Sequence, residues 1–233
     1  WSYIQTDSRK KLRLAVQGQW RQADNNDNAN LSIGPQLTYV PVPAFNLSLM
    51  PSYSFFRTEL QYVGTVDYGA EKRYLVGKIE QKTLSMVVRL NLSLTPDLSL
   101  QFYGMPFISA GKYSRFKRIT EPRARDLDDR YHLFGDGEIT YDQAAAVYRV
   151  DENGDGLPDY SFGNPDFNFR QFRSNLVLRW EYRPGSTLFL VWSQGRTDYG
   201  YSGVLDFDND LSSLFQGKPD NVFLIKFSYN FNL

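Results

Sequence analysis

The sequence predicts an all-β fold: a transmembrane, antiparallel, up-and-down β-barrel formed by a single domain over residues 1–233. Three observations predict it: apolar and polar residues alternate, connections are alternately short and long, and aromatic residues gather at strand ends. Alternation gives each strand one apolar face, expected to meet lipid, and one polar face, expected to line a wet lumen. The alternative is a soluble antiparallel sheet whose apolar face covers a protein core.

Eight segments alternate, most of them close to the ten residues that a tilted strand needs to cross a bilayer. In the last one, Phe223, Ile225 and Phe227 share one face, while Lys226 and Ser228 lie on the other. The eight segments are 12–20, 31–39, 45–55, 84–94, 98–102, 174–182, 186–192 and 223–233. They predict about eight strands.

The connections between the predicted strands are alternately short and long. "PVPA", "TPD" and "RPGS" are short, whereas residues around 23–28, 56–73, 109–168 and 196–220 form long connections. Outer-membrane barrels have short periplasmic turns and long extracellular loops. We therefore expect a bacterial outer-membrane location with a periplasmic C-terminus, and two main extracellular loops at about 109–168 and 196–220.

Aromatic residues divide between the two predicted membrane interfaces, as interfacial anchoring requires. The periplasmic set is Tyr39, Trp180, Tyr182, Tyr229 and Phe231, and the outer set is Trp20, Tyr53, Phe55 and Trp192.

Residues 1–5 alternate as the tail of a further strand would. Because bacterial single-chain barrels have even strand numbers, we expect the chain to be the C-terminal part of a larger barrel. The alternative is an ordered leader before a closed eight-stranded barrel. Short polar residues and a few charges on the polar face suit a wide, hydrated lumen. The charged residues expected to face the lumen are Arg13, Arg89, Arg173, Arg179, Glu181 and Lys226.

Several stretches resemble a known family: 169–200 ("FRQFRSNLVLRWEYRPGSTLFLVWSQGRTDYG"), 219–233 ("PDNVFLIKFSYNFNL"), "TDSRK" and "LQYVGTVD". They are similar to the C-terminal outer-membrane β-barrel domain, of unknown function, of Bacteroidota proteins that carry an N-terminal carbohydrate-binding family 9-like module. The resemblance implies a cell-envelope role and a link to polysaccharide handling. It carries over no catalytic residue, and the module itself is not in this sequence.

The segment "DENGDGLPD" places oxygen ligands at the spacing of a calcium loop, with Gly156 for the tight turn. Phe162 stands where an EF-hand has its closing Glu, so the motif resembles the shorter loops of dockerin and thrombospondin type-3 repeats. We expect Ca²⁺ to order the extracellular loop; the alternative is a metal-free surface turn. The expected ligands are Asp151, Asn153, Asp155, Leu157 (through its carbonyl) and Asp159.

The same long loop carries basic residues that could contact lipopolysaccharide phosphates or a partner protein: Lys112, Arg115, Lys117 and Arg118. The balance of charge signs there favours a solvated face with internal ion pairs. Further on, Leu211, Leu214 and Phe215 predict a short helix that ends at Gly217 and covers or plugs the rim.

The chain is expected to act as a pore or as a platform for an envelope complex, alongside an envelope protein partner or an earlier part of the same chain. The rival is an outer-membrane hydrolase with a rim site at His132, near Asp128, Asp129 and Asp136. No serine elbow, phosphate loop or cofactor motif accompanies it, so we expect no catalysis. Equal numbers of acidic and basic residues give no case for a nucleic-acid partner, and the absence of Cys excludes disulfides and thiolate sites.

Overall fold

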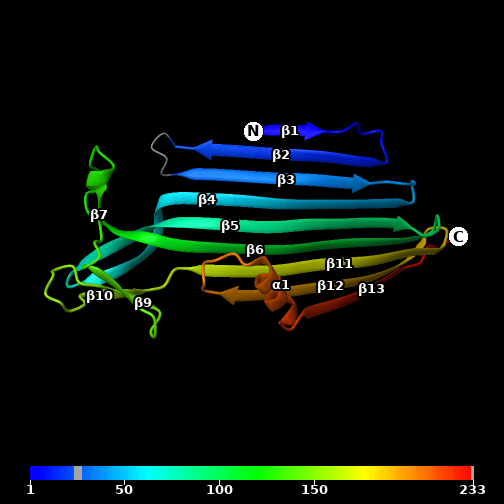
Figure 1. The fold of residues 1–233 in the computed structure, drawn as a ribbon. Coiled ribbons are helices and arrows are strands. Elements are labelled where there is room, and N and C mark those ends of the chain that lie inside the picture. Colours follow the sequence, from blue (N-terminus) through cyan, green and yellow to red (C-terminus); the bar gives the residue numbers. More distant parts are fainter. Residues whose placement is uncertain (24–27, 232–233) are drawn as a thin grey trace.

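The computed structural model describes residues 1–23 and 28–231, and nearly all of its regular structure is antiparallel β-sheet. One path of neighbouring strands runs β1-β2-β3-β4-β5-β6-β11-β12-β13, with β7 paired to β6 (Figure 1). These strands are β1 (Ser2–Gln5), β2 (Leu12–Gln22), β3 (Ala29–Tyr39), β4 (Phe45–Tyr68), β5 (Glu71–Ser93), β6 (Leu98–Ile119), β7 (Tyr131–Leu133), β11 (Phe167–Arg183), β12 (Ser186–Gly200) and β13 (Asp220–Ser228).

The predicted all-β, antiparallel, up-and-down order is confirmed, because sequence neighbours pair along the path except where β11 follows β6. Closure into a barrel is not seen. Within the described residues β1 pairs with β2 and β13 with β12, so the main sheet has two free edges. Every residue of β13 is exposed.

Each of the eight predicted segments falls in a strand for most of its length, and several of these strands are much longer than expected. β4, β5 and β6 have 24, 23 and 22 residues, so the expected long connection at 56–73 is an extended hairpin. It closes in a tight turn where Gly69 adopts φ +61. The last strand ends at Ser228, and Asn232 and Leu233, which continue the predicted alternation, lie outside the described residues.

The pairing register aligns the alternation of separate strands on a common face. Leu14 pairs with Leu37, Leu37 with Leu49 and Leu49 with Val88. Across the rest of the sheet, Leu178 pairs with both Leu100 and Leu190. One face of the sheet, called the apolar face below, therefore carries the apolar set of every long strand, and the opposite face is called the polar face.

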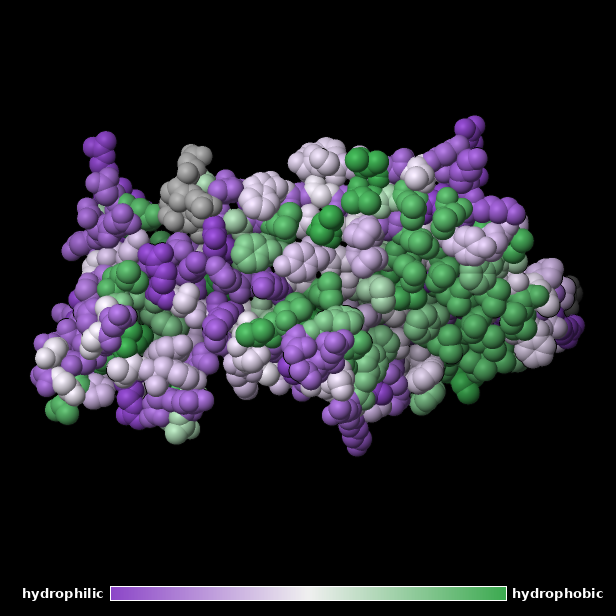
Figure 2. All heavy atoms as spheres, viewed as in Figure 1, coloured by the Kyte–Doolittle hydropathy of each residue, from purple (hydrophilic) through white to green (hydrophobic). Residues whose placement is uncertain are grey.

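The apolar residues form a slanted band rather than a square patch. On β2 the band runs from Leu12 to Trp20, whereas on β12 it runs from Leu188 to Trp192. One cross-strand row shows the slant. It starts at Trp192, the outer limit of the band on β12, and ends at Tyr39, the inner limit of the band on β3. The residues between them in this row are Leu176, Phe102, Leu90 and Leu47. Figure 2 shows apolar residues over the half of the molecule on the right of the view and hydrophilic ones on the left.

The long strands continue past the band into an outer lobe. Register shifts between Thr58 and Gln61, Tyr62 and Gly64, and Val76 and Lys78 mark the point where β4 and β5 leave the band and bend. A second sheet, β10-β9-β8, packs there: β8 (Ile139–Asp142), β9 (Val147–Val150) and β10 (Tyr160–Gly163). The lobe has its own core of Leu75, Phe116, Phe134, Val150, Tyr160 and Phe162.

In residues 1–23 and 28–231, helical structure is limited to a 3-10 turn, η1 (Asp128–Arg130), and helix α1 (Phe207–Gln216), which confirms the short helix predicted there. Asp206 caps α1 by accepting a hydrogen bond from the backbone N–H of Asn209. In the described part of the chain, no helix has the length and apolarity needed to cross a membrane.

Candidate functional site

The six charged residues predicted to face a lumen all project from the polar face. Arg13 and Arg89 share one cross-strand row through Thr38 and Ser48, and Lys226 shares another with Arg179 through Phe189. Arg173 and Glu181 lie on the same side of β11 as Arg179. Glu181 accepts a 2.8 Å hydrogen bond from Arg179.

Two other cations of this set lie over aromatic rings. The guanidinium of Arg89 lies 5.6 Å from the ring centre of Tyr103, and the ammonium of Lys226 lies 5.9 Å from that of Phe189. Arg13 Nε is shielded from solvent without a hydrogen-bond partner in the described residues. Five cations accompany one carboxylate in this set, so these six residues together carry a positive net charge.

Hollows between β1, β2 and β3 add uncharged polar groups to this face. One of about 290 Å³ is lined by residues that include Tyr3, Arg13, Gln36 and Ser48. Another of about 380 Å³ is lined by Trp1, Gln17, Gln19 and Ser52, among others. The wall can therefore form hydrogen bonds with polar solutes. The separation of faces is incomplete, because Val191 and Leu224 pair on the polar face.

The predicted calcium loop, residues 151–159, connects β9 to β10 at the surface of the outer lobe. Asp151 accepts backbone hydrogen bonds from Gly154, Asp155 and Gly156, which draws the turn around its carboxylate. Asp159 accepts from the backbone of Glu152 and from both nitrogens of Asn153.

The fit of this loop to a metal ion is partial. Asp155 accepts from Leu157 N–H, and Gly154 and Gly156 have φ of +76 and +86, which suits a tight calcium-type turn. No three His, Cys, Asp or Glu side chains gather around a potential metal position in residues 1–23 and 28–231. Ca²⁺ binding stays a prediction.

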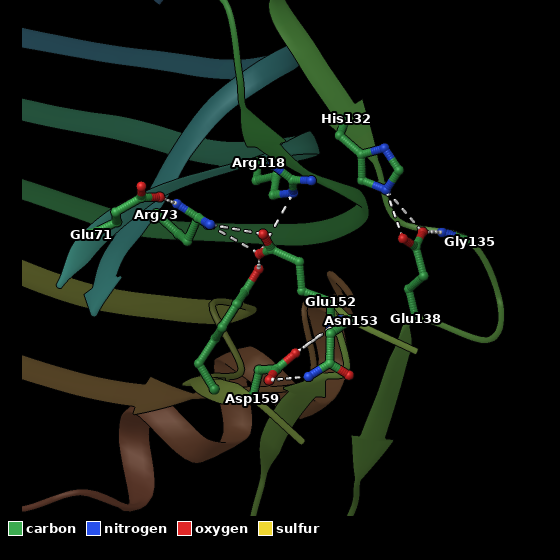
Figure 3. Close-up of polar contacts among 10 residues, drawn as sticks. Glu71, Arg73, Arg118, His132, Gly135, Glu138, Glu152, Asn153 and Asp159 are labelled. Atoms are coloured by element: carbon green, nitrogen blue, oxygen red, sulfur yellow. Dashed lines mark hydrogen bonds and ion pairs between the residues drawn. The ribbon is translucent and has the colours of Figure 1, made fainter. Parts of the chain in front are cut away.

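Glu152 lies inside the same loop and forms ion pairs with strands β5 and β6 (Figure 3). The sequence did not indicate this role. The carboxylate of Glu152, 9% exposed, lies 3.0 Å from Arg73 of β5 and 3.6 Å from Arg118 of β6. It also accepts a 2.8 Å hydrogen bond from the hydroxyl of Tyr160. Burial, and then this hydrogen bond, raise the pKa of Tyr160, so the phenol stays protonated as the donor.

The four basic residues considered for contact with lipid phosphates or for internal ion pairs have different environments. Lys112 and Arg115 are exposed. Lys117 is fully buried, with its ammonium 2.8 Å from the carbonyl oxygen and 3.1 Å from the carboxylate of Glu59. It therefore forms an internal ion pair, as in the alternative that the balance of charges favoured, although the pair is buried rather than solvated. Arg118 faces Glu152 and is partly buried.

His132 lies at the rim of the lobe, and its partner is an acid that the sequence analysis did not select. Its Nε2 lies 2.8 Å from Oε1 of Glu138 (Figure 3). Asp128, one of the expected acids, instead accepts a hydrogen bond from the hydroxyl of Tyr131. The His132 ring also packs edge-on against the ring of Phe134, with 6.0 Å between the ring centres. A hydrolase role for His132 stays a hypothesis.

A family described as "Domain of unknown function (DUF5916)" matches residues 1–232. The chain belongs to this family. Comparison with curated proteins and with solved structures found no match. The function of the DUF5916 family is unknown, so the function of the chain is inferred from its structure.

In this DUF5916 chain, α1 lies against the apolar face rather than in a lumen, as Figure 1 shows it beside β11 and β12. There, beyond the outer limit of the band on β12, the same face carries Arg170, Gln194, Arg196 and Asp198. Arg170 donates 2.6 Å hydrogen bonds to Asp198 and Asp210, and Arg196 donates to the carbonyl oxygens of Phe215 and Gly217. The helix thus covers these polar residues and exposes its own Phe207 and Phe215, at 49% and 45%.

Acid is expected to loosen the His132–Glu138 segment of the DUF5916 chain. A hydrogen bond from Gly135 N–H, and then His132, lower the pKa of Glu138. A lowered folded pKa stabilises the segment above the unfolded value of about 4.3, and this contribution disappears as pH falls through the folded value.

The test uses a spin label on Asp136→Cys, which is selective because the chain has no cysteine. We expect label mobility to rise below about pH 4. The matched Glu138→Gln variant should be mobile at neutral pH already. Unchanged mobility at pH 3 in the parent protein would contradict the prediction.

Proposed function

We propose that this chain forms part of the wall of a bacterial outer-membrane β-barrel, which acts as a pore or as a platform for an envelope complex. The observation that carries the proposal is the slanted apolar band, continuous over strands that are far apart in sequence. Such a band, with aromatic residues at both limits and polar groups behind it, suits tilted strands in a bilayer.

Two other features support the proposal. The short connections lie at one end of the sheet and the outer lobe at the other, as expected for periplasmic and extracellular sides (Figure 1). The free edges of β1 and β13 suit pairing with further strands of a larger wall. A link to polysaccharide handling is compatible with the amide and hydroxyl groups of the polar face.

The proposal is tested on the full-length native protein, extracted from outer membranes in mild detergent and reconstituted in planar bilayers. A pore predicts stepwise conductance that prefers anions, because cations outnumber the carboxylate on the polar face. Absence of conductance from protein that is correctly inserted would exclude a pore and leave the platform. Recovery in the aqueous fraction without detergent would contradict both.

Reversing Arg13 and Arg89 to Glu should remove the preference for chloride over potassium, because it balances the charges of the six polar-face residues. Lys72→Glu, at the exposed tip of the outer hairpin, is the matched control and should leave the preference unchanged. If the double reversal also changes nothing, these side chains do not line the conducting path.

We further propose that Ca²⁺ orders the loop at 151–159. At the millimolar affinity of extracellular sites, 10 mM Ca²⁺ should stabilise the loop by about 1.5 to 3 kcal/mol, seen as slower proteolysis than with a chelator. Asp155→Asn should weaken the effect, whereas Asp142→Asn in the neighbouring turn should not. Equal protection with and without Ca²⁺ would contradict the proposal.

A further inference from the structure

An apolar groove of about 480 Å³ runs along the apolar face between α1 and strands β5 and β6. Apart from Ser85, its lining is entirely apolar. The lining includes Leu84 and Met86 on β5, Gly104 and Pro106 on β6, and Leu211 and Phe215 on α1. This volume is within the range of sites that hold small molecules.

Small residues keep the floor of the groove open. Gly104 has no side chain, and a Cβ built there would lie 2.9 Å from the ring of Phe102. Pro106, two residues on, has a short, rigid ring on the same face. Because α1 is fixed by Arg170 and Arg196, the opposite wall of the groove is also held in place.

The groove has the dimensions of one membrane leaflet. From Phe102 to Ile108 it follows β6 for six residue steps, about 20 Å of strand. At the roughly 45° tilt of membrane strands this is about 14 Å of depth, near half of a hydrocarbon core of about 30 Å. A fatty acyl chain therefore fits along it.

Cationic side chains lie directly beyond the outer end of the groove on the same face. Lys82 precedes Leu84 by two residues on β5, and Lys112 follows Ile108 by four on the antiparallel strand β6; both are exposed. They lie in successive cross-strand rows, about 7 Å apart along the strands. The carboxylate in the row of Lys112 is Glu80, and Lys78 is bound to it at 3.0 Å.

We propose that the groove binds an acyl chain of a phosphorylated glycolipid of the lipid A type, with Lys82 and Lys112 binding its phosphates. The proposal rests on the outer-membrane function above, which places α1 and the lobe at the outer leaflet. Ammonium groups in two successive rows suit a lipid with two phosphates better than a phospholipid with one.

The test is native mass spectrometry of the full-length protein, delipidated in detergent and then offered lipid A, dephosphorylated lipid A or phosphatidylglycerol. We expect one lipid A to remain bound. Met86→Trp, which fills the groove from an exposed position, should abolish retention. Leu190→Trp, equally exposed on the same face outside the groove, should not. Lys82→Gln with Lys112→Gln should lower affinity at least about tenfold.

Equal retention by Met86→Trp and Leu190→Trp would overturn the site, and retention of dephosphorylated lipid A or phosphatidylglycerol at the same affinity would overturn the ligand. Failure to retain any lipid would also overturn the inference. Protein that still needs detergent and still conducts would then keep the proposed function intact, so the two failures are distinguishable.

Discussion

Replacing Glu59 by alanine is expected to destabilise the outer lobe by about 3 to 5 kcal/mol, since it removes the carboxylate beside a fully buried ammonium. Lys117 Nζ lies 3.1 Å from Glu59 Oε2, and the two side chains are 1% and 12% exposed. The loss should appear as faster amide hydrogen exchange in residues 71–78 and 112–119, with the strands of the apolar band unchanged.

The matched control removes both charges. Glu59→Leu combined with Lys117→Met leaves neither partner buried alone, so its exchange rates should be much closer to those of the parent. If the single and double variants exchange equally fast, the ion pair is not the cause of the protection.

Replacing Arg170 by methionine is expected to release α1 from the apolar face. Arg170 holds Asp210, whose side chain is 2% exposed, and Asp198, both at 2.6 Å. Without the guanidinium, two carboxylates remain beside each other and one is buried, so the docked helix should lose about 3 to 5 kcal/mol.

A spin label on Ser212→Cys reports this release, because Ser212 is on the exposed side of α1. Its mobility should rise sharply in Arg170→Met. Arg173→Met, three residues along the same strand but on the polar face, should leave it unchanged. A label that is equally immobile in all three proteins would show that α1 is held by other contacts.

The alternation of residues within the apolar band was sufficient to predict the strands there. It failed at the extension of β4, because the shifts between Thr58 and Gln61 and between Tyr62 and Gly64 displace the two-residue period. Charged residues such as Glu59 also make this part of the sequence resemble a loop. The length of β4 is thus set by pairing with β5, which a single segment cannot reveal.

The sequence also predicted the features of the candidate sites only where they depend on neighbouring residues, and missed those that depend on contacts between residues far apart in the chain. The short helix was found from Leu211, Leu214 and Gly217, but its position on the apolar face depends on Arg170, forty residues earlier than Asp210. Lys117 looked like a surface cation because its partner, Glu59, is 58 residues away. Glu152 was hidden for the same reason, since Arg73 and Arg118 lie on other strands.

In the described residues the main sheet has two free edges, β1 and β13. On the proposed function, these edges limit the order in which strand pairing and membrane insertion can occur. Each edge strand presents unpaired backbone N–H and C=O groups, and each such group costs several kcal/mol in hydrocarbon. An open wall cannot enter a bilayer alone at that cost. On the proposed function, therefore, β1 and β13 must pair with neighbouring strands before or during insertion, so that pairing of the sheet edges and entry into the bilayer are one coupled event.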